Sequence, residues 1–146
     1  VLSGEQIFKY VPVEGGYAKS VDYLENKESF SDFSRLAIDG SVWVTEDDKV
    51  FKYTRGEKED FVISGFSDNS YQFGEIFTDS DASGIYVIDR VNSALLVISK
   101  EGVYKKAYQS QEFSRASDLV VDEAQGKMYI AVASKILVAN LSEDIQ

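Results

Sequence analysis

Residues 83–109, "SGIYVIDRVNSALLVISKEGVYKKAYQ", contain three apolar runs separated by the polar stretches "DRVN" and "KEG". Each run is too short for a helix and has the length of a strand. The polar stretches are rich in residues that favour tight turns. This part of the chain therefore predicts consecutive antiparallel strands joined by short connections.

The same pattern recurs along the chain. Aromatic residues at the centre of one apolar run are 43 residues apart: Trp43, Tyr86 and Tyr129. A phenylalanine precedes each unit at a spacing of 40 residues: Phe33, Phe73 and Phe113. A regular period of this size is the sequence signature of a repeat architecture.

Each unit is predicted to hold four short strands, in the best-defined case at residues 35–39, 41–45, 49–54 and 58–63. The strands carry apolar residues on both faces, which predicts sheets that are covered on both sides. Four-stranded units of this length, stacked face to face, are typical of a β-propeller. The sequence thus predicts an all-β, propeller-like array of four-stranded antiparallel blades that is incomplete, with about three to four blades.

We expect a single domain over residues 1–146 with four units. They are a partial first blade (1–30) with two strands, around Phe8 and Ala18, a second (31–70), a third (71–112) and a fourth that lacks its outer strand (113–146). Tyr17, Val21 and Leu24 have helical spacing, so a short helix within residues 17–30 is an alternative. A strand is favoured there, because this segment occupies the place of the fourth strand of the first unit.

The unit around Tyr86 resembles an NHL-type β-propeller repeat, which has an aromatic-Val pair, an Asp, an Asn three residues on, an aliphatic strand and a glycine turn. The matching positions are Tyr86, Val87, Asp89, Asn92, 95–98 and Gly102. The resemblance extends over most of the chain, although the units around Trp43 and Tyr129 have lost one or both polar residues. It implies a fold more than a function, because such repeats occur in propellers that bind proteins, carbohydrates or RNA and occasionally in enzymes.

Composition excludes several classes of function. With 25 acidic and 15 basic residues the net charge is -10, which disfavours nucleic acid and anionic lipid as partners. The chain contains no Cys and no His, which removes thiol and imidazole chemistry and nearly all zinc, copper and haem ligation. We therefore expect no cofactor, no metal and no catalytic residue.

The apolar runs and the first residues of the sequence indicate what kind of protein the chain comes from. No apolar run approaches the roughly 20 residues that span a bilayer, and no signal-peptide pattern follows Val1. The non-Met start favours a soluble piece of a longer, multidomain protein. Nothing in the sequence indicates the cellular compartment.

Three charged residues, each just before or at the start of an innermost strand, are the candidate binding site: Arg35, Glu75 and Arg115. In a propeller they would lie near the mouth of the central channel, where two guanidinium groups could bind an acidic group of a ligand or partner. The alternative is a structural role in which Glu75 pairs with Arg35 and Arg115 between blades.

Two further sets of residues have both a functional and a structural interpretation. Asp39, Asp79 and Asp122 each end a first strand and could hold calcium, but their recurrence favours hydrogen-bonded turns. Asp89 and Asn92 are likewise expected to cap a loop. Several aromatic residues could form an interface or fill the gaps between blades: Tyr71, Phe73, Tyr104, Tyr108 and Phe113.

The function expected from these features is a non-catalytic interaction or scaffold module that binds a protein partner or the rest of its own chain. Self-association through open blade edges is part of this expectation. The alternative is a propeller enzyme of the lactonase or lyase type with a carboxylate-bound calcium. The lack of His and the incomplete axis disfavour an enzyme.

Overall fold

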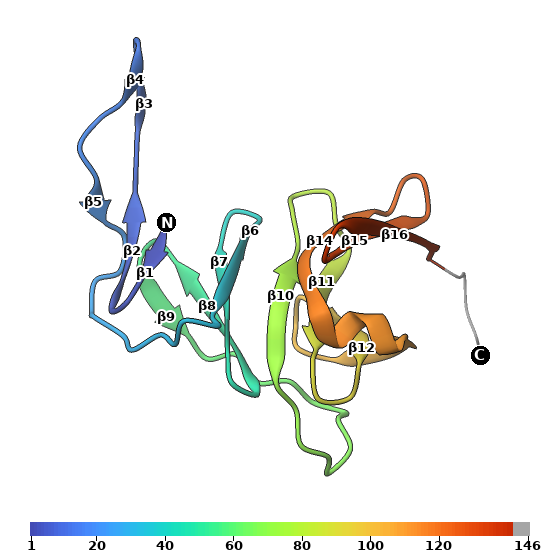
Figure 1. Cartoon of the computed structure of the whole chain (residues 1–146). Coiled ribbons are helices and arrows are strands. Elements are labelled where there is room, and N and C mark those ends of the chain that lie inside the picture. The colour runs from blue at the N-terminus through green and yellow to red at the C-terminus, as the bar shows by residue number, and fades with distance from the viewer. Residues whose placement is uncertain (142–146) are drawn as a thin grey trace.

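The computed structural model describes residues 1–141, whose regular structure is strands apart from one short 3-10 helix, η1 (Gln111–Arg115) (Figure 1). The strands are β1 (Leu2–Ser3), β2 (Gln6–Lys9), β3 (Pro12–Val13), β4 (Gly16–Tyr17), β5 (Val21–Asp22), β6 (Arg35–Ile38), β7 (Val42–Glu46), β8 (Lys49–Thr54), β9 (Glu57–Glu59), β10 (Phe73–Phe77), β11 (Gly84–Asp89), β12 (Ala94–Ser99), β13 (Tyr104–Gln109), β14 (Ala116–Asp122), β15 (Lys127–Val132) and β16 (Lys135–Asn140). The prediction of an all-β chain is confirmed.

Four antiparallel sheets follow one another along the chain. The second and third have four strands each, β6-β7-β8-β9 and β10-β11-β12-β13, and the first and fourth have three, β1-β2-β5 and β14-β15-β16. The first strands of the second, third and fourth sheets lie side by side, with β10 between β6 and β14 (Figure 1). The described sheets form an open, blade-like array and not a closed ring, as predicted.

The 43-residue period corresponds to the second strand of three sheets. Trp43, Tyr86 and Tyr129 lie in β7, β11 and β15, where the latter two pair with Val97 and Val138 of the following strand. Because the side-chain period of a strand is two residues, this common register fixes which side chains face the next sheet.

The turns after the first strands depend on the three aspartates at their ends. In each turn an Asp Oδ1 accepts backbone N–H bonds from residues two or three positions further on: Ser41 for Asp39, Asp81 and Ala82 for Asp79, and Gln125 for Asp122. Asp89 does the same for Val91 and Asn92. The structural interpretation of these carboxylates is confirmed.

Apolar side chains fill each space between neighbouring sheets. The three clusters include Ile7, Leu24, Val44 and Tyr53 between the first and second sheets, Trp43, Ile85, Val87 and Leu96 between the second and third, and Tyr86, Ile88, Leu95 and Met128 between the third and fourth. Each cluster also contains one phenylalanine from before or at the start of a first strand: Phe30, Phe73 or Phe113. Before the second sheet this is Phe30, whereas Phe33, which aligns with Phe73 and Phe113, is exposed.

The first unit differs from the expectation of two strands. It has three, and a separate hairpin of β3 and β4 projects away from the sheets between β2 and β5 (Figure 1). Residues 17–30 contain no helix. In this segment β5 is the strand that pairs with β2, so the strand favoured there is present but short. The sequence predicts that the fourth unit lacks its outer strand. Such a strand would follow Asn140, and residues 142–146 lie outside the described residues, so this part of the prediction is not tested.

Candidate functional site

The predicted charged cluster is assembled in part. Glu75 lies in β10 with its side chain 5% exposed, and its Oε1 is 3.4 Å from Arg35 Nε at the start of β6. Its other oxygen pairs with Arg90, which follows β11. The structure therefore brings Arg35 and Glu75 together across two sheets, as the structural alternative predicts.

Arg115 lies elsewhere and does not flank Glu75. It ends η1, where its guanidinium pairs with Glu112 at 2.7 Å, three residues earlier in the same helical turn. Lys135 pairs with the other oxygen of Glu112 at 2.9 Å, so Arg115 belongs to an exposed group on the fourth sheet. The aligned "FSR" segments have different secondary structures, which is why their arginines diverge.

Arg90 takes the place that the sequence assigned to Arg115. Its guanidinium also donates to the backbone carbonyls of Ser114, at 3.1 Å, and Ala116, at 2.9 Å. The absence of a side chain at Gly74 makes room for it, since a Cβ there would lie 2.5 Å from Arg90 Nε. Glu75 and Arg90 together connect three consecutive sheets through both oxygens of Glu75 and both terminal nitrogens of Arg90, while Arg90 Nε is buried without a hydrogen-bond partner among residues 1–141.

Two further polar contacts join the sheets nearer their periphery. The Lys100 ammonium lies 2.9 Å from Asp39 Oδ2. Burial acts to raise the pKa of Asp39, but hydrogen bonds from Trp43 and Lys100 outweigh it and hold that pKa below its ordinary value. Between the third and fourth sheets, Glu123 accepts a bond from the Tyr86 hydroxyl at 2.8 Å. Burial and this carboxylate raise the pKa of Tyr86.

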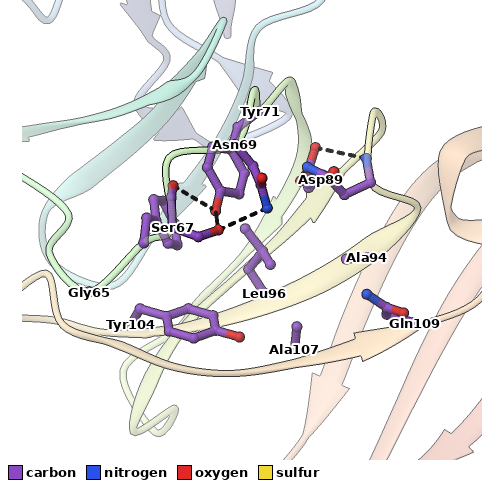
Figure 2. Close-up of a pocket in the computed structure, with 12 residues that line it drawn as sticks. Gly65, Ser67, Asn69, Tyr71, Asp89, Ala94, Leu96, Tyr104, Ala107 and Gln109 are labelled. Carbon is purple, nitrogen blue, oxygen red and sulfur yellow. Dashed lines mark hydrogen bonds between the residues drawn. The ribbon is translucent and has the colours of Figure 1, made fainter.

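A pocket of about 360 Å³ lies on the third sheet, between the face formed by β12 and β13 and the segment 65–71 that precedes β10. It exists because β9 ends at Glu59, so that the chain from 65 to 71 loops over the face of β12 and β13 (Figure 2). We call it the loop pocket. Leu96, Ala94 and Ala107 line its sheet side, and Phe66, Asn69 and Tyr71 line its loop side.

The polar groups of the loop pocket divide into two sets. On the loop side, the Tyr71 hydroxyl and the Asn69 amide both bond to Ser67 Oγ. Asp89 is fully buried, and its carboxylate is saturated by three backbone N–H groups and by the Asn92 amide. On the sheet side, the Tyr104 hydroxyl and the Gln109 amide have no hydrogen-bond partner within residues 1–141. The sequence had marked Tyr71 and Tyr104 as candidate contact residues, but nothing in it predicted the loop that joins them.

Within residues 1–141, no group of three or more Asp and Glu side chains is arranged to hold a metal ion. In the same part of the chain, no helix has the length and apolar character needed to cross a membrane.

In comparisons with protein-family models, curated proteins and solved structures, nothing matches this chain significantly. The resemblance of the Tyr86 unit to an NHL-type repeat therefore stays a prediction from its sequence pattern.

Proposed function

We propose that this chain is a non-catalytic interaction module, a segment of an NHL-type β-propeller that binds a protein through the uncovered face of its fourth sheet. The observation that supports this proposal is the exposure of branched apolar side chains on that face: Val120, Ile136 and Val138 are 47%, 67% and 58% exposed. Tyr129 and Ala131 complete this open face. Apolar side chains gathered on one sheet face are typical of an interaction surface.

The register shows that this face repeats a buried one. Val138 pairs with Tyr129 as Val97 pairs with Tyr86, and Ile136 pairs with Ala131 as Leu95 pairs with Ile88. Leu95 and Val97 are buried under the fourth sheet. The fourth sheet thus presents the same kind of surface that the third sheet buries, and another sheet stacked in the same way would cover it.

Size-exclusion chromatography with light scattering tests this proposal. We expect the chain to associate and to bind the dye ANS at high micromolar concentration, and the double variant Ile136→Thr, Val138→Thr to be monomeric with weaker ANS binding. Threonine keeps the β-branched shape that suits a strand. The matched control is Val62→Thr, Val91→Thr, which changes two valines that are as exposed but lie outside this face. A monomeric, ANS-silent wild type that unfolds cooperatively would contradict the proposal.

The enzyme alternative has its own test. A lactonase or lyase that uses a carboxylate-bound calcium should bind calcium tightly with one-to-one stoichiometry, measured by isothermal titration calorimetry. The interaction module is expected to give no heat of binding in the same titration.

A further inference from the structure

The loop pocket has features that the stacking of sheets does not require. Its sheet side carries small side chains, Ala94 and Ala107, where larger ones would close the space against the loop. Tyr104 and Gln109 extend from β13 on either side of Ala107, and Leu96 lies next to them on β12 (Figure 2). The hollow therefore has an apolar floor with hydrogen-bonding groups at its rim.

The charges around the loop pocket restrict its ligand. Its described lining contains no Lys or Arg, so nothing there would pair with a phosphate or a carboxylate. Asp89, its one acidic residue, already accepts four hydrogen bonds and is fully buried, so it offers little attraction to a cation. A neutral ligand is the chemical class that remains.

The available hydrogen-bonding groups specify the ligand further. A phenol hydroxyl donates and accepts, and a primary amide does both through separate atoms. Tyr104 and Gln109 therefore match hydroxyl groups, which also donate and accept, and Leu96 and Ala107 between them match a patch of C–H groups. A pyranose ring combines these two features, because its hydroxyls radiate from the edge while its ring hydrogens form an apolar face.

We propose that the loop pocket binds one pyranose unit of a neutral saccharide, with the ring over Leu96 and Ala107 and its hydroxyls bonded to Tyr104 and Gln109. A volume of about 360 Å³ is at the small end of the range for ligand pockets. It suits a single ring and its substituents better than a longer chain. This site lies between the third sheet and the loop 65–71, apart from the open face of the fourth sheet.

Saturation-transfer NMR tests the proposal with defined probes: methyl β-D-glucopyranoside, methyl β-D-galactopyranoside and N-acetyl-D-glucosamine. We expect at least one of them to receive saturation at its ring hydrogens. Ala107→Leu should weaken that binding more than about tenfold by filling the floor. Gln109→Ala should weaken it about fivefold through the loss of a hydrogen bond. Gln125→Ala, which removes an exposed amide from a turn of the fourth sheet, is the matched control and should bind as the wild type does.

The same experiment can overturn the proposal. The proposal fails if none of the three sugars receives saturation at about 10 mM, a concentration at which even millimolar affinity is detected. It also fails if Ala107→Leu and Gln109→Ala bind as the wild type does. Tetramethylammonium chloride is the counter-probe, since its binding in place of the sugars would show that the aromatic side chains recognise a cation. Thermal unfolding of each variant, with Tyr104→Phe as a conservative second change, separates loss of the site from loss of the fold.

Discussion

The third and fourth sheets have similar sequences but different surroundings. Strands β11 and β12 are buried on both faces, whereas β15 and β16 alternate between buried or half-buried and more exposed positions. The sequences "GIYVID" and "KMYIAV" are comparably apolar, so composition does not account for the difference. What differs is that the third sheet has a neighbour on each side and the fourth has one among the described residues.

This contrast shows what an apolar pattern on both faces of a strand reports. Such a pattern indicates that both faces of the sheet can be buried. Whether both are buried within the same chain is seen only in the structure. Leu95 and Ile136 occupy the same register position and demonstrate this directly, since the first is fully buried and the second is 67% exposed. The effect of this difference on stability can be measured at equivalent positions of the two sheets.

The largest effect is expected at these two equivalent positions. Leu95→Ala should lower the free energy of unfolding by about 3 kcal/mol, because it leaves a cavity between two sheets. Ile136→Ala should change it by less than about 0.5 kcal/mol. Urea unfolding followed by circular dichroism at low protein concentration measures both. Equal losses would show that Ile136 is covered in solution, which would remove the contrast between the sheets.

A smaller effect is expected where charges connect the sheets. Glu75→Gln should cost about 2 kcal/mol, because it leaves the guanidinium groups of Arg35 and Arg90 without their buried counter-charge. Glu112→Gln is the matched control on the fourth sheet, where the carboxylate pairs with the more exposed Arg115 and Lys135. Its effect should be much smaller, because solvent screens that pair. If Glu112→Gln proved the more costly change, the assignment of Glu75 as the connecting carboxylate would be wrong.

The repeat could be predicted because its determinants are local. The period of Trp43, Tyr86 and Tyr129 reflects the length of one sheet plus its turns, and the turn aspartates act on backbone groups within three residues. The Arg35–Glu75 pair could be predicted from the repeat itself, because the two residues begin or lie in equivalent first strands of neighbouring units.

Other features depend on contacts in space that the alignment of the repeat units within the sequence does not show. Arg115 diverges from Arg35 because its segment forms a helical turn, and Arg90 replaces it because Gly74 leaves space in the neighbouring strand. The loop pocket depends on where β9 ends and on how the chain then folds over β13. The projecting hairpin β3-β4 replaces what is a short glycine turn in the next two sheets, and no repeat position signals it.

A third comparison concerns two glycine turns, one in the third sheet and one in the fourth. Gly102, between β12 and β13, has a φ of +89°, and a Cβ there would lie 2.3 Å from the backbone oxygen of Val62 in the preceding unit. Gly126, between β14 and β15, has a φ of +63° with open space around it. We expect Gly102→Ala to cost about 2 kcal/mol and Gly126→Ala about 1 kcal/mol, since only the first adds a clash to the strain of positive φ. Thermal and urea unfolding of both variants would reveal the order, and the reverse order would show that the turn at Gly102 does not press on the second unit.

The smallest effect is expected from the contact of Lys100 in the third sheet with Asp39 in the second. Because the folded state holds the pKa of Asp39 below its ordinary value, the ionised carboxylate stabilises the fold above that ordinary pKa. This stabilisation disappears as the pH falls through the lowered pKa.

Asp39→Asn should therefore be less stable than the wild type near pH 7, by less than about 1 kcal/mol, and the difference should vanish in acid. Asp122→Asn changes the corresponding turn of the fourth sheet, where no ion pair to Asp122 is present within residues 1–141, and is the control for removing the charge of a turn carboxylate without breaking an ion pair. Urea unfolding at steps between about pH 7 and pH 2 measures both differences. A gap between wild type and Asp39→Asn that widened on acidification would mean that burial dominates at Asp39 and that Lys100 does not connect the sheets through it.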